Sequence, residues 1–162
     1  MNEQEQITLA VKIQLLQARY ASSIDNGRLE EWPGYFTEKC IYKVTSEENV
    51  ALGRPLGMIY ADTRGMLKDR VLSLREANIY EQHRYQHLIG MPLVLSRDDT
   101  GLLEVETGFL VARVMRDGQT LLFANGRYLD KVEVAADGSL LFREKIVICN
   151  SSNVHTLLAL PL

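Results

Sequence analysis

Two of the three histidines in this 162-residue chain, His83 and His87, stand four positions apart in the stretch EQHRYQHLIG at 81–90. This spacing places both side chains on one face, whether the segment forms a helix or a strand. Histidine changes its charge near neutral pH, ligates metals through its ring nitrogens and can act as a general base. The pair is therefore compatible with metal binding, with proton transfer, or with polar contacts inside and between subunits.

Metal binding is the least favoured of these uses, because too few ligands accompany the two histidines. A catalytic zinc or iron site takes about three protein ligands, so His83 and His87 would need His155 or a distant carboxylate. A Rieske cluster needs two cysteines and two histidines in pairs, and neither Cys40 nor Cys149 has a histidine beside it. We therefore expect no metal site in this chain.

Proton transfer would need a cavity that one histidine shares with a carboxylate or a phenol. An isomerase or a dehydratase requires only a His–Asp or Tyr–Asp set in an apolar pocket. The residues that could line such a cavity are Tyr20, Asp25, Tyr35, Tyr42, His83 and His87. A module that binds a small apolar ligand in the same cavity, without turnover, is a further alternative.

The same stretch also suits a contact between subunits. Tyrosine and arginine are favoured at wet protein interfaces, and residues 83–87 combine them with histidine and glutamine. The C-terminal sequence LLALPL is largely apolar, so we expect a partner subunit or the chain's own core to cover it. The interface candidates are His83, Arg84, Tyr85, Gln86, His87, Leu160 and Leu162.

The helices that must position these residues lie mostly in the first half of the chain. Apolar side chains recur at the helical period in a stripe that stops near the Asp-Asn-Gly turn at 25–27. The members of the stripe are Ile7, Val11, Leu15, Leu16, Ala18 and Tyr20. A short helix is predicted over 29–36, and Asp62 or Thr63 could cap a third helix that ends near residue 76.

Alternating, β-rich stretches make up most of the remainder, and they predict strands at 40–45, 84–95, 102–115, 120–134 and 140–150. Asp-Gly turns join the last three as hairpins. Glycine and proline in 46–60 favour a loop or a short strand. The order predicts one α+β domain over 1–162, in which three helices pack on a curved antiparallel sheet that forms a cone.

Composition narrows the function further. The formal net charge of −3 argues against nucleic-acid binding, since no basic excess faces the phosphates. No apolar run approaches the ~20 residues of a membrane-spanning helix, and the polar start does not resemble a secretory signal. Two distant cysteines suit free thiols in the cytoplasm.

Several short stretches, in order along nearly the whole chain, carry a family resemblance: 20–21, 24–25, 31–33, 36–37, 40–45, 74–81, 83–85, 87, 128–131 and 158–162. In them the chain resembles the small (beta) subunits of aromatic-ring-hydroxylating dioxygenases, including those of terephthalate and anthranilate dioxygenases and salicylate hydroxylase. That family often has Arg-x-Arg-His where this chain has Arg84-Tyr85-Gln86-His87, so Gln86 replaces an arginine. The glutamine amide can still donate a hydrogen bond.

The resemblance implies a cone-shaped fold like that of nuclear transport factor, ketosteroid isomerase and SnoaL. It also implies a small subunit that carries no cofactor and forms a trimer beneath a trimer of large subunits, an α3β3 complex. The large subunit would hold the Rieske [2Fe-2S] cluster and the mononuclear iron. A reductase or ferredoxin would deliver NAD(P)H electrons, and O2 would hydroxylate an aromatic carboxylate. Our leading hypothesis is therefore a structural subunit without a catalytic centre of its own.

Overall fold

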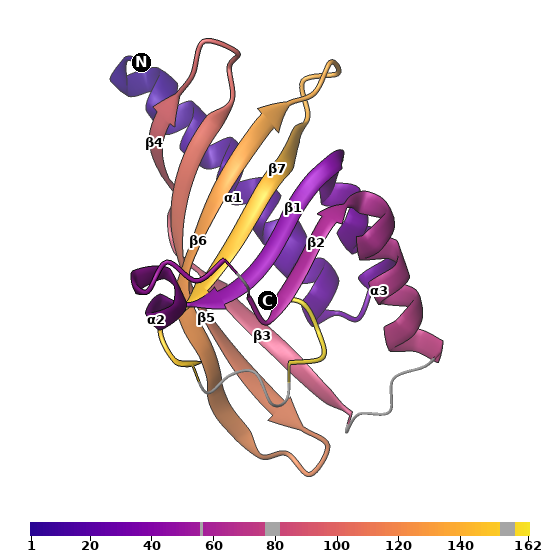
Figure 1. The fold of residues 1–162 in the computed structure, drawn as a ribbon. Helices are drawn as coiled ribbons and strands as arrows, with labels where there is room; N and C mark the ends of the chain where they lie inside the picture. Colours follow the sequence, from indigo (N-terminus) through magenta and orange to yellow (C-terminus); the bar gives the residue numbers. More distant parts are fainter. Residues whose placement is uncertain (56, 77–81, 153–157) are drawn as a thin grey trace.

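A computed structural model describes residues 1–55, 57–76, 82–152 and 158–162 of the chain. Its helices are α1 (Glu3–Asp25), the 3-10 helix η1 (Leu29–Tyr35), α2 (Glu47–Ala51) and α3 (Arg64–Glu76). Its strands are β1 (Phe36–Ser46), β2 (Ile59–Thr63), β3 (His83–Ile89), β4 (Leu93–Arg97), β5 (Leu103–Met115), β6 (Thr120–Val134) and β7 (Leu140–Cys149). Figure 1 shows one long, curved sheet with α1 crossing behind it and α3 beside β2.

The seven strands form one sheet in the order β2-β1-β7-β6-β5-β3, and β4 also pairs with β5. The prediction of a wholly antiparallel sheet is wrong at one place, because β1 and β7 run parallel. Local patterning could not reveal this, since the two strands are far apart in sequence and only the tertiary fold sets their relative direction. The α+β class and the curved sheet are confirmed.

Helix α1 begins at an N-cap, where the Asn2 side chain accepts the main-chain N–H of Glu5 at 2.9 Å. The face of the helix that packs on the sheet was only partly predicted. Ile7, Val11 and Leu15 of the apolar stripe are about half exposed. The buried residues are Ile13, Leu16, Gln17, Tyr20, Ala21, Ser23 and Ile24. The sheet therefore contacts a face that includes two polar side chains, and it leaves part of the apolar stripe in solvent.

The region between β1 and β5 also departs from expectation in two places. The stretch predicted as a loop or short strand contains the short helix α2 as well as β2. The Thr63 hydroxyl accepts the N–H of Met66 at 3.2 Å and so caps α3. The sequence predicted either Asp62 or Thr63 as this cap. The strand predicted over 84–95 is two strands, β3 and β4, which both pair with β5. Pro92, which has no N–H for a ladder, lies between them.

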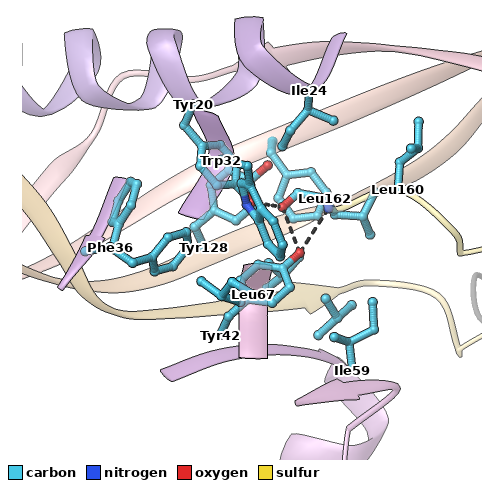
Figure 2. Close-up of a cluster of buried hydrophobic side chains, with 14 of the residues drawn as sticks. Tyr20, Ile24, Trp32, Phe36, Tyr42, Ile59, Leu67, Tyr128, Leu160 and Leu162 are labelled. Carbon is cyan, nitrogen blue, oxygen red and sulfur yellow. Dashed lines mark hydrogen bonds between the residues drawn. The ribbon is translucent and has the colours of Figure 1, made fainter. Parts of the chain in front are cut away.

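Aromatic side chains fill the space between the sheet and the helices (Figure 2). The Trp32 ring meets Tyr42 edge-on with centroids 5.1 Å apart, and Tyr20 meets Phe142 in the same way at 5.7 Å. Such T-shaped pairs are favoured by the ring quadrupoles. Leu160 and Leu162 are buried in this cluster. The apolar end of the sequence is thus covered by the chain's own core, which is one of the two outcomes expected for it.

Candidate functional site

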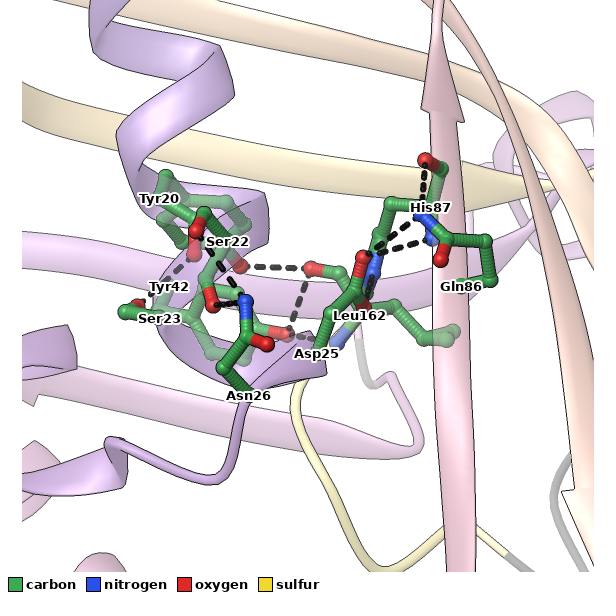
Figure 3. A network of polar contacts seen from close by, with 9 residues as sticks. All are labelled: Tyr20, Ser22, Ser23, Asp25, Asn26, Tyr42, Gln86, His87 and Leu162. Atoms are coloured by element: carbon green, nitrogen blue, oxygen red, sulfur yellow. Dashed lines mark hydrogen bonds and ion pairs between the residues drawn. The ribbon is translucent and has the colours of Figure 1, made fainter.

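The last residue of α1 and the middle of β3 meet at Asp25 and His87 (Figure 3). The His87 Nδ1 lies 2.5 Å from Asp25 Oδ1, and Asp25 Oδ2 accepts the main-chain N–H of His87 at 2.9 Å. Because β3 ends the strand order, this N–H has no neighbouring strand to donate to. The Asp25 carboxylate supplies the missing acceptor and ties the end of α1 to the edge of the sheet.

The rest of the His87 ring is enclosed by protein. Its side chain has 0% exposed surface, and Nε2 has no hydrogen-bond partner among the described residues. The Gln86 amide donates to Asp25 Oδ2 at 3.4 Å, a long contact. Gln86 therefore makes a weak hydrogen bond within the chain.

The predicted cavity residues do not all converge on the histidines. Tyr20 donates its hydroxyl to the main-chain oxygen of Leu162 at 2.5 Å. The Tyr42 hydroxyl accepts the N–H of Leu162 at 3.0 Å and lies 3.2 Å from its oxygen. Burial raises the pKa of Tyr42 to about 12, so this phenol stays protonated and able to donate at neutral pH. Tyr35 packs edge-on against Tyr20 and is partly exposed.

Residues 160–162, with Leu160 and Leu162 buried, therefore occupy the interior in which a stand-alone isomerase would hold its substrate. The structure brings Asp25 and His87 together but uses Tyr20 and Tyr42 to hold the end of the chain. This arrangement positions an internal segment, and the hollow of about 440 Å³ that Asp25 and His87 line among the described residues has a mainly polar lining.

Alternation along β3 sorts the interface candidates into two groups. Tyr85 and His87 are buried, and the Tyr85 ring lies between His83 and Phe123 at centroid distances of 5.2 and 5.3 Å. Arg84 and Gln86 are exposed. Because side chains alternate in direction along a strand, only these two present their side chains fully to solvent. Leu160 and Leu162 lie inside the chain.

Two hollows flank β3, one of about 540 Å³ and one of about 440 Å³. Asp25, Asn26, Arg84 and Val114 line both, so the hollows form one continuous groove between the end of α1 and β3. The larger hollow reaches the β5–β6 turn at Arg116. We call this the β3 groove. Its larger hollow also touches the core residues Ile24, Leu29 and Leu160.

Sequence reasoning missed a buried polar cluster at the centre of the sheet. Lys145 on β7 and Asp130 on β6 are direct cross-strand partners, and Nζ lies 3.3 Å from Asp130 Oδ2. Gln17 donates to Asp130 Oδ2 at 2.6 Å and accepts from Lys145 Nζ at 2.9 Å. The ammonium also lies 3.6 Å from the centroid of the Tyr128 ring. These contacts satisfy charged groups that would otherwise be costly to bury.

Burial lowers the pKa of Lys145 to about 8, although the Asp130 charge opposes the shift. Burial likewise raises the pKa of Asp130. A signal for this pair does exist in the sequence. Asp130 shares the inward phase of its strand with the buried Tyr128 and Val132, and Lys145 shares that of Val147. A charged residue in the apolar phase of a strand calls for a buried partner.

Among the described residues, no group of three or more His, Cys, Asp or Glu side chains could hold a metal ion. Within the same part of the chain, no helix is long and apolar enough to cross a membrane.

Residues 19–153 match the family described as the ring hydroxylating beta subunit. The chain belongs to this family. It is 45% identical over 152 residues to the beta 1 subunit of the terminal oxygenase component of terephthalate 1,2-dioxygenase from Comamonas sp, covering 94% of this chain and 97% of the relative. It is 42% identical to the anthranilate 1,2-dioxygenase small subunit of Burkholderia cepacia, over 93% of this chain and 92% of that one.

Solved structures agree with the family and with the fold. The beta subunit of a candidate aromatic-ring-hydroxylating dioxygenase from Novosphingobium aromaticivorans superposes with a TM-score of 0.87 at 32% identity, covering 96% of this chain and 97% of that one. A candidate scytalone dehydratase from the same organism shares the fold at 16% identity and a TM-score of 0.66, over 90% and 86% of the two chains. Beta subunits of this family therefore share their architecture with proteins of the dehydratase type.

Proposed function

We propose that this beta subunit is a structural, non-catalytic component of an oxygenase that hydroxylates an aromatic carboxylate. The similarity to the terephthalate and anthranilate dioxygenase subunits, over more than nine tenths of the chain, carries this proposal. Both named substrates are aromatic carboxylates. In this assignment the beta subunit supports a large subunit and does not bind the substrate itself.

The filled interior supports the structural role. Tyr20 and Tyr42 hydrogen-bond to Leu162, and the leucine side chain is fully buried. A stand-alone isomerase or a small-molecule binding module would need that interior space for its ligand. Among the described residues, the hollow that Asp25 and His87 line is mainly polar, and the Nε2 atom of His87 is enclosed, so we propose neither alternative as the function.

The partner in this proposal is a large alpha subunit that binds the Rieske [2Fe-2S] cluster and the mononuclear iron, as the family resemblance implies. We propose an α3β3 assembly with a trimer of beta subunits, which a reductase or ferredoxin supplies with electrons. Arg84 and Gln86, exposed on β3, are the interface residues we retain from the predicted set. Both cysteines of the chain are free and buried, which suits the cytoplasm as the proposed location.

Purification from the native host, grown on aromatic acids, tests this function. The tagged chain should bring down a large subunit in equimolar ratio, together with iron and acid-labile sulfide. The complex should oxygenate an aromatic carboxylate when it is given the reductase and NAD(P)H, whereas the isolated chain should not. Turnover of a small cyclic ketone or hydroxy compound by the isolated chain would contradict the structural assignment.

A further inference from the structure

We propose that the β3 groove binds the acidic β4–β5 hairpin of a second copy of this chain, so that copies join head to tail in a closed ring. The inference rests on the proposed function, in which the small subunits form a trimer, and it assigns the two surfaces that meet. The groove provides the positive charge and the hairpin provides the negative charge.

The β3 groove has an excess of basic groups in a chain whose formal net charge is −3. Its basic lining residues are Arg75, which already pairs with Glu30 at 2.8 Å, and His83, Arg84 and Arg116. Asp25 is the acidic residue of the described lining, and it is already held by His87. Neither Arg84 nor Arg116 forms an ion pair with a described residue. The groove is therefore suited to carboxylates from outside the chain.

The turn between β4 and β5 presents such carboxylates in a fixed geometry. Asp98 Oδ1 accepts the main-chain N–H of Thr100 at 2.8 Å and that of Leu102 at 3.0 Å. The hydrogen bond from the Thr100 side chain lowers the pKa of Asp98, so this carboxyl stays ionised. Asp99 and Glu104 are exposed, and neither forms an ion pair with a described residue, although the Ser96 hydroxyl donates to Glu104 Oε2 at 2.8 Å. The hydrogen-bonded turn carries Asp98 and Asp99, and Glu104 follows at the start of β5. A turn that is already ordered loses little conformational entropy on binding.

The two surfaces lie at opposite ends of the sheet. In Figure 1 the β4–β5 turn stands at the top of the molecule, and β3 with the β5–β6 turn lies at the bottom. One chain cannot bring its own groove and hairpin together, but a rotated neighbour can. A contact between two different patches is heterologous, and it gives a ring when the rotation closes. Charge complementarity between these ends of the same chain favours a second copy as the occupant.

Exposed leucines on the strands between the two ends fit the same contact. Leu88 on β3 and Leu93 on β4 are 63% and 60% exposed. Large apolar side chains that stand in solvent beside a charged patch are typical of protein interfaces. Association of two copies would bury them beside the ion pairs.

Sedimentation equilibrium of the isolated chain and of three charge-reversed forms tests the proposal. The wild-type chain should sediment as a ring of copies whose mass falls as salt is raised, because ion pairs at the rim of a contact are screened. Arg84→Glu/Arg116→Glu and Asp99→Lys/Glu104→Lys should each sediment as a monomer. An equimolar mixture of these two variants should recover part of the larger mass, since each supplies the intact partner of the other's altered surface. Asp98 is left unchanged because it holds the turn.

The control is Lys68→Glu, an exposed reversal on α3 away from both surfaces, which should leave the mass unchanged. Far-UV circular dichroism checks that every variant is folded, and the milder Arg84→Gln/Arg116→Gln should give partial dissociation.

A monomeric wild-type chain, a reversed variant that keeps its wild-type mass, or a mixture that stays monomeric would each overturn the proposal. Loss of the large subunit from Arg84→Glu/Arg116→Glu with the ring intact would place the large subunit in the groove instead. Co-purification of iron and sulfide with the wild-type chain is scored separately, so the proposed function can stand when the groove assignment fails.

Discussion

Asp25 shows how one carboxylate can fasten a helix to the edge of a sheet. It accepts two hydrogen bonds from His87, one from the ring and one from the main chain. A His–Asp pair can transfer protons when it faces a substrate. Here the histidine ring is fully enclosed, so the pair acts as a structural clamp between α1 and β3.

We expect Asp25→Asn to lower the free energy of unfolding by about 1.5–3 kcal/mol, the usual range for hydrogen bonds to a charged group. The amide keeps the shape but loses the charge, and it cannot accept both hydrogen bonds as well as the carboxylate does. Urea unfolding of the isolated chain measures the change. Asp69→Asn, on the exposed surface of α3, is the control. Equal midpoints for the two variants would show that the clamp contributes nothing.

The Lys145–Asp130 pair calls for a different comparison. Lys145→Met should cost about 3–5 kcal/mol, because it leaves the Asp130 carboxylate buried without its cation. The double variant Asp130→Leu/Lys145→Met should be less destabilised than Lys145→Met alone, since two apolar groups replace two charges. Chemical unfolding of the three proteins decides this. A double variant less stable than Lys145→Met would contradict this prediction.

The lowered pKa of Lys145 also predicts a pH dependence. Between about 8 and 10.5 the unfolded chain binds a proton at this lysine that the folded chain does not bind. This group should therefore raise the free energy of unfolding as pH increases from about 8 to about 10.5. The same increment should be lost when pH is lowered from about 10.5 to about 8. The difference in stability between wild type and Lys145→Met, measured at several pH values, should change across the window. A constant difference would contradict the assignment.

At the scale of elements, the segment 158–162 fills space between the sheet and the helices. It lies in the middle of the aromatic core, where Leu162 is held by Tyr20 and Tyr42, and Arg70 of α3 donates to the main-chain oxygen of Ala159 at 3.2 Å. Leu160 and Leu162 are thus part of the hydrophobic core.

Leu162→Ala should lower the free energy of unfolding by about 2–5 kcal/mol, because it removes a buried side chain and leaves a cavity. The matched control is Leu95→Ala on β4, where the leucine is largely exposed and its loss should cost little. Thermal and urea unfolding of both variants provide the test. A Leu162→Ala protein as stable as the control would mean that the segment does not occupy the core in solution.

Helix α1 shows why an apolar stripe does not by itself identify a buried face. Ile7 and Val11 follow the helical period but remain half exposed, whereas Gln17 is fully buried. Gln17 is placed inside because Asp130 and Lys145 need its amide. Two partners, 113 and 128 residues further along the chain, therefore override the local pattern.

For the whole molecule, the strand order joins distant parts of the chain. The early strand β1 lies between β2 and the last strand β7, so neither half of the chain has a complete sheet without the other. The single domain over residues 1–162 stays a prediction, and this topology supports it. We expect one calorimetric transition with equal calorimetric and van't Hoff enthalpies. Two separate transitions would show that parts of the chain unfold independently.

The sequence by itself determined the features that depend on neighbouring residues. The Asp-Gly turns formed the hairpins as predicted, because Gly118 and Gly138 adopt positive φ values of 87° and 83° that other residues rarely reach. The bounds of β6 agree with the alternation read from its residues. The stretches that resemble the ring-hydroxylating beta subunits identified the family, and the comparisons confirm it.

Only the tertiary structure decided which distant groups meet. The parallel pairing of β1 with β7, the burial of Lys145 against Asp130 and the position of Leu162 all join residues far apart in the chain. Turns and periodicity follow from steric and solvation preferences that act over a few residues. The direction of a strand, the partner of a buried charge and the position of residue 162 depend on how the whole chain packs around one core. Local sequence does not identify these partners, because they come together only when that core forms.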